Sequence, residues 1–402
     1  MSKYLKQLYF VLIGLLKTRY KWILILFSLW LYRVDFIADV GSGRAKMLQV
    51  ITIFGMLYLI IKYQSNIITY TFSKTHTPIK TFLWLYVYAI ISTFWAYSPT
   101  FSFFLSFQNT VFMIVLVWLF TKMNNFISME KTFIYLMIIS MLFEVVMIRI
   151  IESPVLFIHF LPGGSSAAIC ISYCIGELIS MKKKDATRRH FLYNSLIIAS
   201  VVLITSTSSG ANISAIIGIG IALFISGKVR YALPLIIGSV VLYLNQQWID
   251  EIILFIMPGK TKEIIEIGNG RNTIWAGIMA VTAQRPLYGW GYACGERVAS
   301  GYLNWALSDA HNNYIGLYGG LGLIGIILFV WHQFASIINI FTKRNRIGFT
   351  GLFSAFCCAS INGYSYGYLS GKACSITIIY MAMLVLSLTY SFTRYYDKQR
   401  VK

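Results

Sequence analysis

Charged residues are scarce in this sequence. They make up 12% of its 402 residues, about half of the fraction that a soluble domain carries. Hydrophobic residues account for 57%, and many of them form runs long enough to cross a bilayer. The composition therefore excludes a soluble globular domain and predicts an all-α integral membrane protein. No small-residue cleavage site follows the basic N-terminal segment, so we expect the first span to stay in the protein.

Acidic residues are scarcer still, with 14 Asp and Glu against 34 Lys and Arg and a net charge of +20. This excess does not predict nucleic-acid binding, because a nucleic-acid surface needs basic residues gathered on a folded soluble face. Here the basic residues fall in short turns between apolar runs, as at Lys182, Lys183 and Lys184. Such a distribution is typical of the cytoplasmic turns of a membrane protein.

The motifs of several common chemistries are missing. The six cysteines include no Cys-x-x-Cys pair, so neither a zinc site nor a redox dithiol is predicted. The sequence has no phosphate-binding lysine loop, no His-Glu-x-x-His pair and no recognisable serine triad. We therefore expect neither a metal ion nor a cofactor.

The apolar runs predict the topology. About twelve spans are centred on residues 22–39, 47–62, 81–97, 101–120, 131–150, 165–181, 191–208, 211–227, 231–246, 313–334, 347–364 and 374–393. Every second turn between them is basic, which places both termini in the cytoplasm. We expect a single polytopic domain over residues 1–402, with no internal repeat.

One segment departs from this pattern. Residues 246–312, between the ninth and tenth predicted spans, form a long polar loop on the outer side. Its acids are Asp250, Glu251, Glu263, Glu266, Glu296 and Asp309. Charges of both signs indicate a folded subdomain that faces solvent. Residues 272–284 are predicted to form a helix, in which Ile274, Ile278 and Val281 share a face that rests on the bundle or on the bilayer surface.

Arg271 stands just before this helix. A helix N-terminus offers free backbone N–H groups and partial positive charge, and a guanidinium group beside it would bind a diphosphate. The alternative is a surface arginine that caps the glycine turn before it or pairs with Glu266.

Gly289 and Gly291 lie in an aromatic turn with Tyr288, Trp290 and Tyr292. Glycines let the backbone approach a ligand closely, and aromatic faces suit sugar rings. The alternative for the aromatic residues is an interfacial belt, where Trp and Tyr concentrate in membrane proteins.

His311 is the only histidine of the loop and stands beside Asp309 and Asn312 at the start of the tenth span. Histidine takes up a proton near neutral pH, and a carboxylate beside it can fix its tautomer. The alternative is a helix terminus at which Asp309 is the cap.

Glu144 and Glu177 fall inside the fifth and sixth predicted spans. Intramembrane acids are candidates for a transport pathway. Glu144 can pair with Arg149, whereas Glu177 is close enough to the cytoplasmic end to snorkel. A transporter or flippase is therefore an alternative class, although its polar residues should follow the spans rather than gather in one loop.

The loop motifs resemble the O-antigen ligase and O-antigen polymerase superfamily of bacterial membrane glycosyltransferases. The matching residues are Gly270-Arg271, Trp275, Pro286 with Gly289 and Gly291, and His311-Asn312 followed by Gly319, Gly322 and Gly325. The glycines of the tenth span are interpreted as packing residues.

The resemblance implies a metal-independent, inverting sugar transfer on the periplasmic face of the bacterial inner membrane. The donor would be an oligosaccharide on undecaprenyl diphosphate, with Arg271 holding the diphosphate and His311 activating the acceptor hydroxyl. Gly289, Gly291 and Asn312 would line the substrate site. The implied partners are membrane lipid, a flippase and a chain-length regulator.

The sequence departs from the family in one place. The outer turn before the eighth span usually carries a Ser-Arg pair, but residues 206–211 contain no arginine. Arg285, Arg297 or Arg149 are candidates for the second diphosphate contact by location alone. Because that arginine is regular in ligases, its absence favours a polymerase of surface-polysaccharide repeat units over a ligase that transfers the finished polymer to lipid A–core.

Overall fold

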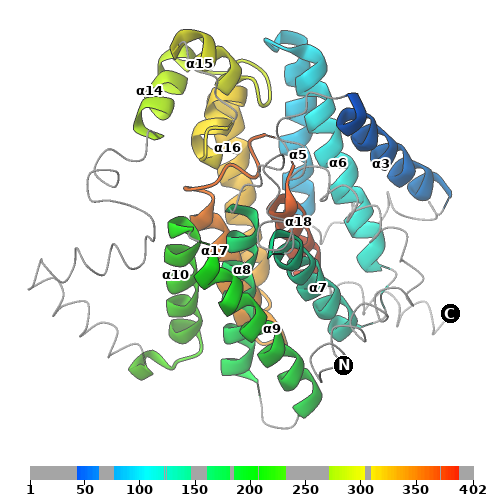
Figure 1. The fold of residues 1–402 in the computed structure, drawn as a ribbon, viewed down its shortest axis with the longest axis vertical. Coiled ribbons are helices and arrows are strands. Elements are labelled where there is room, and N and C mark those ends of the chain that lie inside the picture. Colours follow the sequence, from blue (N-terminus) through cyan, green and yellow to red (C-terminus); the bar gives the residue numbers. More distant parts are fainter. Residues whose placement is uncertain are drawn as a thin grey trace, which may run out of the picture.

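The computed structural model describes residues 43–62, 77–121, 123, 125–145, 161–181, 185–206, 208–231, 271–303, 309–371 and 373–388. In these ranges all regular structure is helical (Figure 1). The helices are α3 (Gly43–Lys62), α5 (Thr77–Ile91), α6 (Pro99–Thr121), α7 (Phe126–Val145), α8 (Leu161–Ser180), α9 (Ala186–Thr205), α10 (Ser209–Ile225), α14 (Arg271–Thr282), α15 (Gly295–Leu303), α16 (Asn313–Phe341), α17 (Phe349–Asn362) and α18 (Ser375–Leu386). Short 3-10 turns lie at Ser92–Trp95 and Val229–Tyr231.

Most predicted spans coincide with helices. The first and ninth, 22–39 and 231–246, fall wholly or almost wholly outside the described residues, and each of the others overlaps one helix. Of the described helices, α6 and α16 are long and apolar enough to cross a membrane by length and composition. Helices α10, α17 and α18 are apolar but shorter. The all-helical class is thus supported, while the count of twelve spans and their orientation stay predictions.

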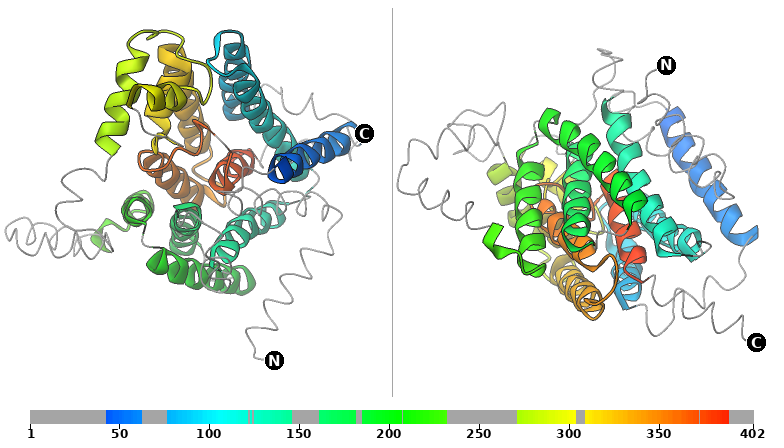
Figure 2. Two further views of the ribbon diagram at one scale, coloured as in Figure 1. Left: turned by 45° about the horizontal axis from the view of Figure 1, so that its top comes forward. Right: turned by 90° about the horizontal axis from the view of Figure 1, so that it is seen from below.

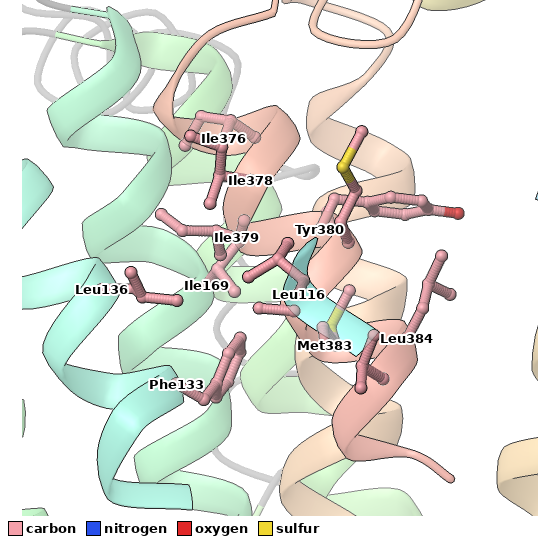
Figure 3. Close-up of a cluster of buried hydrophobic side chains, with 14 of the residues drawn as sticks. Leu116, Phe133, Leu136, Ile169, Ile376, Ile378, Ile379, Tyr380, Met383 and Leu384 are labelled. Atoms are coloured by element: carbon pink, nitrogen blue, oxygen red, sulfur yellow. The ribbon is translucent and has the colours of Figure 1, made fainter. Parts of the chain in front are cut away.

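Helix α18 is the centre of the bundle. All twelve of its residues are buried, and its side chains meet α6, α7 and α8 at Leu116, Phe133, Leu136 and Ile169 (Figure 3). A helix that is apolar on every side is buried either in lipid or among other helices, and the side chains of α18 are buried among other helices.

The outer helices expose apolar side chains instead. On α16 the exposed set is Leu323, Ile324, Ile327, Val330, Trp331, Phe334, Ile338 and Phe341. On α9 it is Tyr193, Ile197, Val201 and Ile204. Apolar surface of this extent is unusual on a soluble monomer and suits contact with lipid.

Three charged side chains are buried between helices. The Arg188 guanidinium donates to Glu130 through Nε at 2.7 Å and also bridges to Glu177. Glu177 accepts the Gly351 N–H of α17 as well, at 2.9 Å. The expectation that Glu177 snorkels to the cytoplasmic edge is therefore wrong, because it is 1% exposed. Its charge is instead compensated by a cation from α9.

Helix α16 is broken at Gly322, whose φ of 65° and ψ of −160° are not helical. A break within a span frees backbone groups that lipid cannot satisfy. The segment 286–291 supplies their partners. Its four backbone hydrogen bonds to α16 are Trp290 N–H to Gly319 O at 3.1 Å, Gly291 N–H to Gly320 O at 2.8 Å, Leu323 N–H to Pro286 O at 2.8 Å and Ile324 N–H to Leu287 O at 3.1 Å.

Helices α14 and α15 lie beside the N-terminal half of α16, at one end of the bundle (Figures 1 and 2). Helix α14 extends over 271–282, close to the predicted 272–284. Ile274, Ile278 and Val281 are buried in a small second core shared with Ala299 and Ala310. The predicted face is confirmed, and it rests on the bundle.

Candidate functional site

Arg271, Asp309 and His311 come together at the start of α16. The Nδ1 atom of His311 is 3.8 Å from Oδ2 of Asp309. The charges of Asp309 and of His311 each interact with that of Arg271. The side chains of His311 and Asp309 are 22% and 25% exposed, so a substrate can reach them.

The turn that carries His311 is fixed by α14. The indole Nε1 of Trp275, one helical turn after Arg271, donates to the carbonyl of Ala310 at 2.9 Å. His311 itself has a φ of 51°, a left-handed conformation that costs roughly 1–2 kcal/mol for a residue with a side chain. Strained backbone conformations of this kind persist only where the surrounding structure enforces them, and they are frequent at active sites.

The electrostatics favour a neutral imidazole and a cationic guanidinium. Burial, and after it the positive charge of Arg271, lowers the pKa of His311 to about 4. Burial also lowers the pKa of Arg271, and the Asp309 carboxylate offsets part of that effect. At neutral pH His311 is therefore uncharged and able to accept a proton, while Asp309 can stabilise the imidazolium that results.

Asn312 is the N-cap of α16. Its Oδ1 accepts the N–H groups of Tyr314 and Ile315, at 2.8 and 3.1 Å. The interpretation in which Asp309 caps this helix is therefore wrong. The cap leaves Asn312 1% exposed, and its side-chain oxygen is already occupied.

Arg285 is not near Arg271. The twelve residues of α14 separate them by about 17 Å of helix. The guanidinium group of Arg285 stacks over Trp290, 4.1 Å from the ring centroid, and donates to the Trp95 carbonyl at 3.3 Å. Arg297 lies on α15, exposed, and stacks on Phe101 at 3.6 Å. Arg149 lies outside the described residues.

The glycines of the aromatic turn meet protein rather than open space. Gly289 and Gly291 have φ values of 65° and 95°. A Cβ on Gly289 would lie 2.5 Å from the Gly320 carbonyl oxygen, and one on Gly291 would collide with Ala96. Both positions therefore need glycine so that the turn can approach α16 and the start of α6. Of the α16 glycines, Gly319 and Gly320 pack against this segment, as predicted, whereas Gly322 has a positive φ and breaks the helix.

The aromatic residues of the same turn are also engaged internally. Trp290 donates through Nε1 to the Val281 carbonyl at 2.9 Å. Tyr292 is 1% exposed, and its hydroxyl donates to the Leu369 carbonyl at 2.9 Å. Only Tyr288, at 42% exposed, presents a large free ring surface.

Sequence reasoning assigned no role to Glu296. It is the second residue of α15 and only 6% exposed. Burial raises its pKa to about 8, and the Asp309 charge adds to the shift. An acid in the first turn of a helix is ordinary, because the helix dipole favours it, so the sequence gives no sign that this one is buried.

Among the described residues, no three His, Cys, Asp or Glu side chains gather into a group that could hold a metal ion. The site is a basic and imidazole-bearing cluster at one end of an apolar helical bundle. Chemically, a cluster of this kind can attract an anion and accept a proton.

Residues 195–330 match the model of the family described as O-antigen ligase. The chain therefore carries a domain of the O-antigen ligase and polymerase superfamily, and the resemblance indicated by the loop motifs is confirmed. Enzymes of this family are multi-pass membrane proteins that transfer sugar chains linked to lipid diphosphates. The match includes Arg271, Trp275 and His311. A comparison with curated proteins finds no match.

The predicted class of enzyme, a membrane glycosyltransferase with a lipid-diphosphate-linked donor, is confirmed by this match. A lipid-linked oligosaccharide is accordingly the substrate class.

Proposed function

We propose that this protein is a polymerase of undecaprenyl-diphosphate-linked oligosaccharide repeat units, acting on the periplasmic face of the inner membrane. The observation that carries the proposal is the convergence of Arg271, Asp309 and a neutral, reachable His311 at the start of α16. A cation for a diphosphate and a base for a hydroxyl are the two groups that this transfer needs.

Each residue then has a defined role. Arg271 and the free N–H groups at the start of α14 hold the diphosphate and stabilise its charge as it leaves. His311 removes the proton from the acceptor hydroxyl, which attacks the anomeric carbon on the face opposite the diphosphate. The bond to the carrier breaks as the new glycosidic bond forms, so the configuration inverts. Asp309 compensates the charge of the imidazolium.

The turn at 206–211 supports a polymerase over a ligase. It contains no arginine, and it packs closely on its neighbours. A Cβ on Gly164 would lie 2.6 Å from Oγ of Ser206, and one on Gly210 would lie 2.5 Å from Cβ of Ser365. This turn therefore offers no arginine for a second diphosphate contact, and Arg285 and Arg297 lie beside aromatic rings elsewhere.

The family description itself favours a second candidate, the O-antigen ligase that transfers the finished polymer to lipid A–core. Both activities use the same donor and the same base, and they differ in the acceptor.

The test is a gel of cell-surface polysaccharide from the gene-deletion strain, complemented with wild type, His311→Ala or Arg271→Ala. For a polymerase, the deletion and both variants leave lipid A–core with a single repeat unit. For a ligase they leave bare core, and long lipid-linked polymer accumulates. A full ladder with His311→Ala would refute both activities as described here.

A further inference from the structure

A buried carboxyl group lies behind the proposed base. Glu296 of α15 accepts the backbone N–H of Ala310, the residue before His311. Its Oε2 atom is buried and has no hydrogen-bond partner among the described residues. Neither has Oγ of Ser370, a fully buried residue in the loop between α17 and α18.

These groups share one small polar space that glycines leave open. A Cβ on Gly316 would lie 3.0 Å from Oε1 of Glu296 and 2.5 Å from Oγ of Ser370. A Cβ on Gly367 would lie 3.0 Å from the same hydroxyl and 2.5 Å from Oδ1 of Asp309. Ser370 thus lies near both carboxyl groups, and Glu296 interacts with the His311 turn through the Ala310 N–H and through the charge of Asp309.

The positive charge around Glu296 is not enough to compensate both Glu296 and Asp309 as carboxylates. The titratable groups that face it or its neighbour Asp309 are Tyr292, Cys294, Arg297, Asp309, His311 and Arg271. The helix α16 and the described part of the α17–α18 loop present uncharged Gly316 and Ser370 to it. Arg297 is exposed and stacked on Phe101. Arg271 is therefore the one half-buried cation in the described cluster, and Asp309 already interacts with it.

We propose that Glu296 is a positioning residue of the transfer reaction that works in its protonated, uncharged form. It holds the Ala310 N–H and so fixes the turn of His311, while Asp309 remains the single carboxylate beside Arg271. A second carboxylate would compete for Arg271 and repel the donor diphosphate, because like charges at short range in a low-dielectric site interact strongly. The inference rests on the proposed function of Arg271 and His311.

The test is the pH dependence of chain extension. Purified full-length protein is added to membranes of the gene-deletion strain, which contain its native lipid-linked repeat units, and the rate is measured from pH 6 to pH 10. The wild-type rate should fall about tenfold per pH unit above the pH near 8 at which Glu296 ionises. Glu296→Gln should keep the rate at pH 7 within about threefold and lose this alkaline fall.

Two variants complete the design. Glu296→Ala removes the acceptor for the Ala310 N–H and should be slower than Glu296→Gln at every pH. Asp185→Asn, at the exposed N-cap of α9, makes the same change of carboxylate to amide far from the site and should leave the profile as in wild type. The thermal transition of each purified variant shows that it is folded.

An alkaline fall in folded Glu296→Gln equal to that of the wild type would overturn the proposal. So would the loss of activity in this folded variant at pH 7, because the carboxylate would then be the working form. Equal rates for Glu296→Ala and Glu296→Gln would refute the proposed role of the hydrogen bond between the side chain at position 296 and the Ala310 N–H. Full extension by His311→Ala would instead refute the proposed function, whatever the result at position 296.

Discussion

At the scale of the residue, the site depends on protonation states set by burial. His311 is held in a left-handed turn by its neighbours, close to a cation that disfavours its charged form. An unperturbed histidine would be partly protonated at the mildly acidic pH at which this one stays neutral.

We therefore expect the rate of chain extension to fall on the acidic side only at an unusually low pH. Because the neutral imidazole is the base, and burial lowers its pKa to about 4, the rate of chain extension should stay level from pH 7 to about pH 5. It should fall as the pH drops through 4 and His311 becomes protonated. The measurement is the rate in the membrane assay from pH 3.5 to pH 7. A fall centred near pH 6.5 would show that neither burial nor Arg271 lowers the pKa of His311.

Local sequence could predict some of these residues and not others. Arg271 and His311 were recognisable, because a helix start after a glycine turn and a histidine at a span edge are visible in the chain itself. Glu296 was not, because its burial results from contacts with Asp309, Ser370 and α16 that are distant in sequence. Arg285 was included for its place in the loop, yet α14 separates it from Arg271.

At the scale of the element, the broken helix α16 positions the site. The His311 turn leads directly into its N-terminal part. At the break at Gly322, the backbone of segment 286–291 forms hydrogen bonds with the residues on either side. The apolar run predicted this helix but not its break, because Gly322 looks the same in sequence as a glycine used for helix packing.

Gly322→Ala should destabilise the protein and reduce activity together. The residue has a positive φ, and its Cβ would lie 2.5 Å from the Leu287 backbone. The φ and ψ of Gly322 lie in a region that essentially only glycine adopts, so backbone strain of roughly 1–3 kcal/mol and the clash both act against the variant. Gly301→Ala in α15 is the matched control, because nothing lies within 4 Å of its Cβ, and it should gain about 0.5–1 kcal/mol. Thermal unfolding in detergent measures both; an unchanged transition for Gly322→Ala would contradict the role of the break.

The buried ion pairs among α7, α8 and α9 give a second prediction at this scale. Arg188→Met removes the cation from Glu130 and Glu177, which are both buried. Leaving buried charges without their partner costs roughly 3–5 kcal/mol, so the thermal transition should fall by many degrees. Arg230→Met, an exposed arginine on Tyr231, should change it little. Equal transitions for the two variants would show that the carboxyl groups are neutral without Arg188.

At the scale of the whole molecule, the predicted spans and the helices agree because apolar length alone decides where a chain can cross a bilayer. Helix α18 overlaps the twelfth predicted span, but its place at the centre of the bundle was not predictable. Its position depends on which helices pack together, and no local pattern contains that information.

The proposed orientation can be tested with single cysteines. Tyr302 of α15 and Asn345, in the turn after α16, are exposed, and the proposal places them on opposite sides of the membrane. In intact spheroplasts a membrane-impermeant maleimide should label Tyr302→Cys at once and Asn345→Cys only after lysis. The native cysteines are buried except Cys357, which is half-buried, so the unmodified chain is the control. The reverse pattern would invert the topology and move the site to the cytoplasm.

The four hydrogen bonds between segment 286–291 and α16 run from main chain to main chain, and this has a consequence for divergence among related proteins. Side chains at most of these positions are free to change without loosening the joint. Only the places where two backbones approach within contact distance, such as Gly289 and Gly320, must keep the smallest residue. Relatives of this enzyme can therefore preserve this joint while the segment that forms it retains little more in common than the spacing of its glycines.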